Sequence, residues 1–191
     1  AVIKGLTSQG FPKELFAIVQ GVNPEITHWL AKAPEITAIG FTGSGMVGKL
    51  LIKLSQERDV PIPVYAEMGS LNPVFFTPGA LAEKADELAK AAMDSALLGS
   101  GQFCTKPGII VVPDDAAGDK FITQIESYVA SQKVGPLLNK GIAGRFSEAV
   151  SALTKSKGLK VISGTNNPDG FGVTPTIFVV NWSDVKNDRT I

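Results

Sequence analysis

Residues 41–48 read Phe41-Thr42-Gly43-Ser44-Gly45-Met46-Val47-Gly48, which contains the pattern G-x-G-x-x-G. An apolar, strand-like run precedes this stretch and a run with helical spacing follows it, which is the context in which the pattern binds a phosphate. Glycines allow a tight turn there, and the unpaired N–H groups of a helix N-terminus attract an anion. The same residues also fit a simpler interpretation, a glycine-rich turn in which Ser44 caps the helix. Both interpretations require a strand followed directly by a helix.

The chain on either side of this turn alternates short apolar runs with runs of helical spacing. We expect strands at 15–20, 36–41 and 64–67, and helices at 24–33 and from Met46 to about Arg58. Prolines after the second helix end it before the strand at 64–67 begins. The order strand, helix, strand predicts a parallel sheet with helical crossovers.

The rest of the chain continues with longer helices. The expected strands are 72–76, 108–112, 160–162 and 176–180, and the expected helices run from Leu81 to Ala96, from Phe121 to Val129 and from Ile142 to Leu153. The glycines at 99–101 break the first of these helices. The predicted fold class is therefore α/β with a parallel, Rossmann-like sheet. The boundary between two parts is expected near 67–73, where two proline-flanked strands meet.

Composition limits the class of protein. The 191 residues carry 18 Lys plus Arg and 18 Asp plus Glu, so no basic surface for nucleic acid is indicated. Apolar residues make up 44% of the chain, but no apolar run approaches the roughly 18 residues of a membrane span. A single Cys excludes an internal disulfide framework, and no cluster of His, Asp and Glu suggests a metal site. We expect a cytoplasmic protein without nucleic-acid, membrane or metal partners.

The only cysteine is the first candidate for chemistry. Cys104 lies between Gly99-Ser100-Gly101 and Pro107-Gly108, so we expect its thiol on a turn rather than in a core. Backbone N–H groups on such a turn are available as oxyanion donors. A free cysteine is more often a small buried hydrophobe, which is the competing interpretation.

A nucleophilic thiol needs a nearby base. The only histidine, His28, lies beside Trp29 in a short amphipathic helix, which argues against a Cys–His hydrolase. Glu67 ends an apolar strand, and the carboxyl ends of parallel strands border the region where ligands bind. Spacing from the glycine pattern alone first suggests a ribose-binding role for Glu67. An ordinary solvent-exposed glutamate at a strand end is the alternative.

Three segments taken together resemble one known family. They are Phe41-Thr42-Gly43-Ser44 with Gly48, then Glu67-Met68-Gly69 with Asn72-Pro73, and then Gly101-Gln102-Phe103-Cys104-Thr105. Their order, spacing and flanks resemble the aldehyde dehydrogenase superfamily, and the resemblance spans essentially the whole chain. It implies NAD(P)-dependent oxidation of an aldehyde to a carboxylic acid.

The resemblance implies a role for each candidate residue. Cys104 would be the nucleophile that forms a thiohemiacetal and then a thioester, and its N–H would give half of an oxyanion hole. Glu67 moves from ribose binding to catalysis, as the general base that activates water. NAD or NADP would be contacted at six residues: Gly43, Ser44, Val47, Gly48, Met68 and Gly69.

Departures from the commonest form of the family indicate which branch of the family this sequence resembles. Ser70 and Leu71 stand where that form has a glycine and a lysine, Lys106-Pro107-Gly108 follows the cysteine without the frequent arginine, and the separation of Glu67 and Cys104 is slightly long. With the segment at 78–83, these features resemble the branch that acts on α-ketoglutaric semialdehyde (2,5-dioxopentanoate).

Segments that the family carries upstream and downstream are not found in this sequence. We therefore expect a central fragment: 1–67 as the second half of the NAD(P)-binding domain and 68–191 as the first part of the catalytic domain. The expectation is that this piece is catalytically poor alone and that the intact enzyme is a homo-oligomer acting on a small-molecule aldehyde. Two rival functions stay open. One is an inactive nucleotide-binding or interaction module, and the other is an acyl transferase or hydrolase that uses Cys104 and Glu67 without nicotinamide.

Overall fold

The computed structural model describes residues 1–21, 23–167 and 169–187. The chain divides into two compact units, Ala1–Gly69 and Ser70–Ile191, and each is described by itself. None of the helices in the described ranges combines the length and hydropathy that a membrane span requires.

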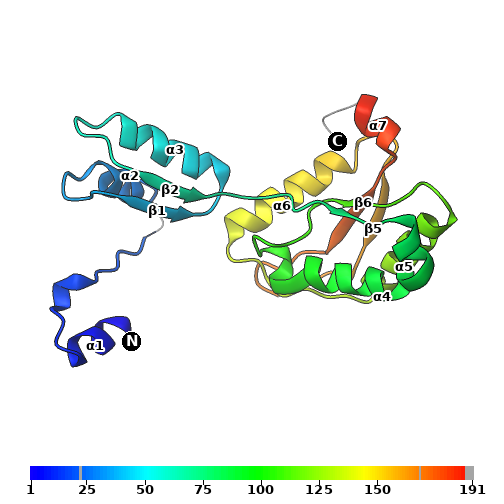
Figure 1. The fold of residues 1–191 in the computed structure, drawn as a ribbon, viewed down its shortest axis with the longest axis horizontal. Coiled ribbons are helices and arrows are strands. Elements are labelled where there is room, and N and C mark those ends of the chain that lie inside the picture. The colour runs from blue at the N-terminus through cyan, green and yellow to red at the C-terminus, as the bar shows by residue number, and fades with distance from the viewer. Residues whose placement is uncertain (22, 168, 188–191) are drawn as a thin grey trace. The chain divides into compact units, whose positions relative to one another are not determined.

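The first unit contains a strand–helix–strand motif (Figure 1). Its elements are α1 (Val2–Ser8), η1 (Lys13–Leu15), α2 (Glu25–Lys32), β1 (Ile39–Thr42), α3 (Gly45–Gln56) and β2 (Val64–Glu67). Strands β1 and β2 pair in parallel, with Ile39 opposite Val64 and Thr42 opposite Glu67. The predicted strand at 64–67, the helix after the glycine turn and the parallel pairing are thus confirmed.

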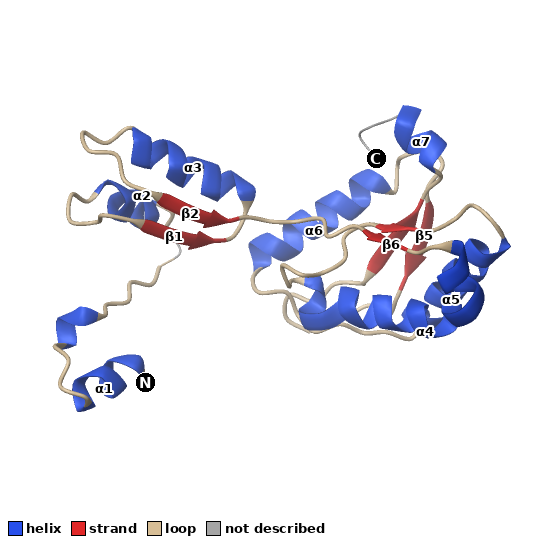
Figure 2. Ribbon diagram, in the orientation of Figure 1, coloured by secondary structure: helices blue, strands red, loops and turns tan. Residues whose placement is uncertain are grey.

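Helix α3 lies beside strands β1 and β2 (Figure 2). A small apolar core joins helices α2 and α3 to this sheet. Ala31 of α2 and Leu51 and Leu54 of α3 are buried, and Phe41 and Val64 of the strands pack against them. The guanidinium of Arg58 ties the ends of the two helices together by donating to backbone carbonyl oxygens. Its Nη1 lies 2.8 Å from Ala31 O and 2.9 Å from Ala33 O, and its Nη2 lies 3.0 Å from Ile36 O.

The predicted strand at 15–20 is wrong. Lys13–Leu15 forms a short 3-10 helix, and residues 16–20 belong to no helix or strand. Ile18 and Val19 are 67% and 61% exposed. A strand is stabilised by the backbone groups of a neighbour, and the described sheet of this unit consists of β1 and β2 alone. Apolar β-branched residues without a pairing strand do not form one.

The second unit has longer helices and short strands. Its elements are β3 (Val74–Phe75), α4 (Pro78–Leu97), η2 (Leu98–Gly101), β4 (Ile110–Val111), α5 (Ala116–Ala130), α6 (Lys140–Leu153), β5 (Lys160–Ser163), β6 (Thr176–Val179) and α7 (Trp182–Asn187). Side chains at the helix starts cap the backbone: Asp115 accepts from Ala117 N and Gly118 N, and Asn139 accepts from Ile142 N.

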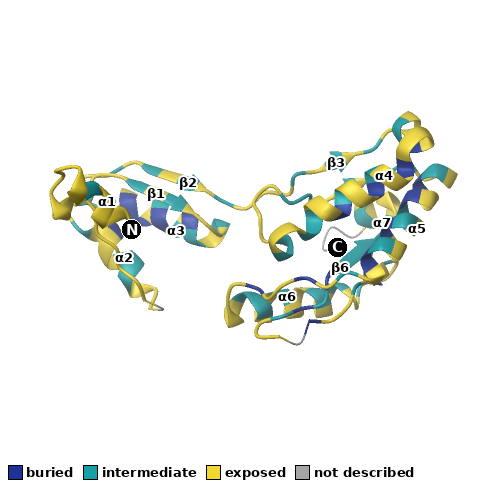
Figure 3. Cartoon of the chain, turned by 90° about the horizontal axis from the view of Figure 1, so that it is seen from below, coloured by how far each residue is buried: buried dark blue, intermediate teal, exposed yellow. Residues whose placement is uncertain are grey.

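Helices α4 and α5 share the main core of this unit. Met93 of α4 and Phe121 and Val129 of α5 are its largest fully buried side chains, and Ile162 of β5 joins them. Buried residues on these helices appear dark blue in Figure 3. This core fixes the carboxyl end of α4, and the cysteine loop begins directly after it.

Strand pairing in the second unit is only partly parallel. Strands β3 and β4 pair in parallel, whereas β5 and β6 pair antiparallel, with Lys160 opposite Val179. A parallel pair needs a crossover connection, usually a helix. The described part of the connection between β5 and β6, residues 164–167 and 169–175, contains no helix, which fits the antiparallel return.

Candidate active site

The carboxyl ends of β1 and β2 bring several predicted site residues together. The N–H of Gly43 donates to the carbonyl oxygen of Glu67 at 3.0 Å, which extends the strand pairing by one residue. Glu67 is the last residue of β2, and its side chain is exposed. The glycine turn and the predicted general base therefore lie beside each other at one edge of the sheet.

The turn leads directly into α3. The Ser44 hydroxyl accepts from Val47 N at 3.4 Å, so the capping interpretation of Ser44 is confirmed. This cap leaves the anion-binding interpretation open, because a helix has four N–H groups without intrahelical partners at its start and the cap takes only one. The Val47 side chain packs against the core of Ala31, Leu51 and Leu54.

Gly48 lets α3 approach the residue that follows β2. A Cβ added at Gly48 would lie 2.7 Å from the sulfur of Met68 and 3.5 Å from the Cβ of Ala66. Only a residue without a side chain allows this contact while Met68 keeps its position. The structure therefore places Met68 against the first turn of the helix. Gly69 is exposed and ends the first unit.

Cys104 lies in the second unit, on a loop and with its side chain exposed. The predicted break of the preceding helix is confirmed, because α4 ends at Leu97. Gly99, Ser100 and Gly101 follow with φ of 58°, 60° and 71°, a left-handed conformation that glycine adopts without strain. The competing interpretation of Cys104 as a small buried hydrophobe is therefore wrong.

Two polar side chains tie this loop to the segment before α6. The Ser100 hydroxyl donates to Gly135 O at 3.0 Å. Gln102 Oε1 accepts from Leu138 N at 2.9 Å, while its Nε2 donates to Gly99 O at 3.1 Å. The Ser100 and Gln102 contacts with Gly135 and Leu138 therefore hold the loop against residues 135–138.

Two further residues hold the loop, and sequence reasoning did not assign them a role. The Ser70 hydroxyl donates to the carbonyl oxygen of Cys104 at 2.8 Å, and Asn72 Nδ2 donates to the same oxygen at 2.7 Å and to Lys106 O at 2.8 Å. The available signal was the departure at Ser70 from the glycine of the commonest family form. Only the structure shows what its hydroxyl contacts.

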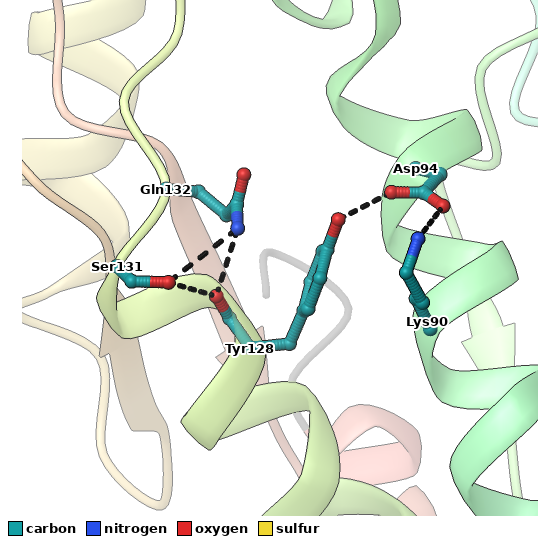
Figure 4. Close-up of polar contacts among 5 residues, drawn as sticks. All are labelled: Lys90, Asp94, Tyr128, Ser131 and Gln132. Carbon is teal, nitrogen blue, oxygen red and sulfur yellow. Dashed lines mark hydrogen bonds and ion pairs between the residues drawn. The ribbon is translucent and has the colours of Figure 1, made fainter.

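A separate polar cluster lies on α4 and α5 (Figure 4). Asp94 accepts from Tyr128 Oη through one oxygen and from Lys90 Nζ at 2.6 Å through the other. The hydrogen bond from Lys90, followed by that from Tyr128, lowers the pKa of Asp94. The hydrogen bond to Asp94 raises the pKa of Lys90 and that of Tyr128. Within the described ranges, no group of three or more His, Cys, Asp or Glu side chains could hold a metal ion.

Comparison with known proteins identifies the family. The family model described as "Aldehyde dehydrogenase family" matches residues 1–191. The chain belongs to the aldehyde dehydrogenase family. Among solved structures of this fold, an NAD-dependent benzaldehyde dehydrogenase from Corynebacterium glutamicum superposes with a TM-score of 0.76 at 25% identity, over 96% of this chain and 41% of that one. The predicted α/β aldehyde dehydrogenase fold is thereby confirmed.

Two curated aldehyde dehydrogenases are similar over most of the chain. The α-ketoglutaric semialdehyde dehydrogenase 2 of Azospirillum brasilense is 36% identical over 85% of this chain, and the α-ketoglutaric semialdehyde dehydrogenase of Acinetobacter baylyi is 34% identical over 88%. The matches cover 31% and 32% of those two proteins. The chain therefore spans about a third of the length of these relatives.

The start of α3 fits a dinucleotide cofactor of the kind that this family uses. Gly43 and Ser44 are exposed, and a Cβ added at Gly45 would meet no atom within 4 Å. Open backbone at the N-terminus of a 12-residue helix can accept a pyrophosphate without displacing a side chain. The assignments of Gly43, Ser44, Val47, Gly48, Met68 and Gly69 to the cofactor remain predictions, as do the roles of Glu67 and Cys104.

Proposed function

We propose that the protein to which this chain belongs is an NAD(P)-dependent dehydrogenase that oxidises α-ketoglutaric semialdehyde to 2-oxoglutarate. The observation that carries the proposal is the state of Cys104: its thiol is exposed on a loop. Among the described residues, the hydrogen bonds include none donated by its backbone N–H. A nucleophile and an oxyanion donor on one residue suit addition to a carbonyl group.

The first steps of the reaction belong to Cys104. Its thiolate adds to the aldehyde carbon, a C–S bond forms, and the π electrons move to the oxygen, which the Cys104 N–H stabilises. The nicotinamide cofactor, when bound, supplies the acceptor for the hydride that leaves this carbon. The acyl group then remains on Cys104 as a thioester.

Glu67 acts in the second half of the reaction. Its carboxylate takes a proton from a water molecule as that water attacks the thioester carbon. The C–S bond breaks, the sulfur leaves as a thiolate, and the carboxylic acid product is released. The exposed side chain of Glu67 at the end of β2 is open to water, which this step requires.

The substrate is proposed from the two relatives named for it, which are 36% and 34% identical to this chain. A small carboxylated aldehyde also agrees with the departures at Ser70 and Leu71, which resemble that branch. We further propose that the intact enzyme is a cytoplasmic homo-oligomer. The proposal includes either NAD or NADP as the cofactor.

Substitution of the nucleophile tests the proposal. In the protein expressed from its complete reading frame, Cys104→Ala should lower the rate of oxidation of 2,5-dioxopentanoate by about 10³-fold or more, while NAD or NADP still binds. Ser147→Ala, which changes an exposed serine on α6, is the matched control and should retain activity. Turnover that survives in Cys104→Ala would exclude the assigned nucleophile.

Titration of the thiol separates the proposal from its alternative, an inactive nucleotide-binding or interaction module. A Cys104 thiol that reacts quickly with an alkylating reagent supports the enzyme. An inert thiol, together with binding of NAD or NADP but no aldehyde oxidation, supports the module.

A further inference from the structure

The peptide that follows Cys104 is held by side chains from a distant segment. Ser70 and Asn72 precede the cysteine by 34 and 32 residues, yet both donate to its carbonyl oxygen, at 2.8 and 2.7 Å. A carbonyl oxygen has two lone pairs, so these two donors saturate it. The Ser70 hydroxyl has one proton, and Cys104 O is nearer than its other acceptor, Asn72 Oδ1 at 3.1 Å.

The backbone around these side chains is fixed as well. Gly108 N donates to Leu71 O at 2.7 Å, and Val74 N donates to Ile109 O at 2.9 Å, so residues 71–74 run beside 108–109. A Cβ at Gly108 would lie 2.9 Å from Leu71 O. The two segments can therefore approach this closely only because residue 108 is glycine. Ser70 therefore faces the cysteine loop from a segment that the strand pair β3–β4 holds in register.

Asn72 shows that this arrangement has a conformational cost. Its φ of 43° is left-handed, which is uncommon for a residue other than glycine. Its amide compensates by donating to both Cys104 O and Lys106 O. Strain at such a position persists only where the surrounding contacts over-determine it.

The two sides of Cys104 differ in their hydrogen bonding. Its carbonyl oxygen is saturated by Ser70 and Asn72, whereas its N–H donates to no acceptor among the residues that the structure describes. Fixing the peptide after the cysteine restricts its ψ and so the direction of its Cα–Cβ bond. The two donors also partly neutralise the negative charge of the carbonyl oxygen. Without them, that charge would repel a thiolate on the same residue.

We propose that Ser70 is a positioning residue for Cys104: its hydroxyl, together with the Asn72 amide, fixes the cysteine peptide so that the thiol and N–H face the substrate together. The inference rests on the proposed function, in which Cys104 is the nucleophile. Ser70 touches neither substrate nor cofactor in this role and acts through the backbone of Cys104.

The test uses Ser70→Ala, Ser70→Thr and the control Ser147→Ala in the protein expressed from its complete reading frame. Ser147 is also exposed and its hydroxyl also donates to a carbonyl oxygen, that of Ala143 in the same helix, away from the cysteine loop. The readouts are the alkylation rate of Cys104 by iodoacetamide, kcat and KM for 2,5-dioxopentanoate, and the Kd of NAD or NADP.

Loss of one hydrogen bond of ordinary strength should lower kcat and the alkylation rate of Ser70→Ala by about tenfold. The cofactor Kd should stay within about twofold of the wild-type value, because a positioning role does not reach the cofactor. Ser70→Thr keeps a hydroxyl and should recover most of the kcat and of the alkylation rate. If the role of Ser70 were merely structural, kcat would not fall while the cofactor Kd stays unchanged.

Asn72→Gly is the second variant, since glycine keeps the left-handed backbone without strain but removes the amide donors. Asn72→Gly should also lower kcat and the alkylation rate of Cys104. If Ser70→Ala folds poorly, this second variant still tests the proposal. Alkylation and kcat in both variants equal to those of Ser147→Ala would overturn the proposal. If the wild-type protein oxidises no aldehyde, the proposed function fails, while the alkylation rates still decide the role of Ser70.

Discussion

Gly48 and Met68 are in such close contact that a Cβ added to the glycine would lie 2.7 Å from the methionine sulfur. Gly48 lies in the first turn of α3, and Met68 follows the last residue of β2. The third glycine of the G-x-G-x-x-G pattern is the one that permits close packing of helix and strand. Here that packing places Met68, which is predicted to contact NAD or NADP, against the helix.

Replacing this glycine tests the link between helix packing and cofactor binding. Gly48→Ala should displace the Met68 side chain and weaken binding of NAD or NADP by about tenfold, the effect of roughly 1.4 kcal/mol. Titration of the cofactor by intrinsic fluorescence measures it. Gly40→Ala in β1 is the matched control, because a Cβ there meets no atom within 4 Å. Equal affinities of the two variants would contradict the prediction.

Glu67→Gln tests the general base. The amide cannot accept a proton from water, so hydrolysis of the thioester should slow by about 10²-fold or more while acylation of Cys104 continues. Rapid-mixing kinetics should then show a burst of NADH or NADPH followed by a slower steady state. Glu57→Gln, which changes the exposed residue after α3, should leave both phases unaltered. A steady-state rate that is unchanged when deacylation limits turnover would count against Glu67.

Arg58 should be essential for the stability of the first unit. Its guanidinium donates to three carbonyl oxygens at and beyond the carboxyl end of α2, where a helix leaves such groups without partners. Arg58→Lys keeps the charge but loses the planar set of donors. We expect the free energy of unfolding to fall by about 1–3 kcal/mol, measured by urea denaturation. Arg145→Lys, at an exposed site on α6, should change it little.

The cluster on α4 and α5 predicts a pH effect of defined sign. Hydrogen bonds from Lys90 and then Tyr128 lower the pKa of Asp94 in the folded chain. A carboxyl with a lowered pKa stabilises the fold above its ordinary, unfolded pKa, and the contribution is lost as pH falls through the folded pKa. Because Lys90 and Asp94 are exposed, the effect on stability is small and the titration itself is the better measurement.

Lys90→Gln should raise the pKa of Asp94 toward its ordinary value, because the largest cause of the lowering is removed. Carbon-13 NMR of labelled aspartate follows this titration directly. Lys49→Gln in the first unit is the control and should leave the titration curve of Asp94 unchanged. An Asp94 titration that is the same in all three proteins would show that the Lys90 contact does not form in solution.

Local structure that depends on residues close in sequence could be predicted well. Gly43 to Gly48 define a turn between a strand and a helix, and Gly99 and Gly101 supply left-handed conformations that end α4, so the exposure of Cys104 follows from its neighbours. The same local rules failed at 15–20, where apolar and β-branched residues indicated a strand. Pairing with another strand decides that outcome, and propensity does not supply the partner.

The sequence by itself determined the family, the strand–turn–helix order around Gly43 and the placement of Cys104 on a loop, because these depend on residue types at short spacing. The tertiary structure alone decided that Ser70 and Asn72 saturate the Cys104 carbonyl, that Met68 lies against Gly48 and that Arg58 joins two helix ends. Each of those contacts joins residues between 20 and 34 positions apart. A hydrogen bond or close contact over that separation forms only after packing has brought the two segments together, and no periodicity in the sequence records it.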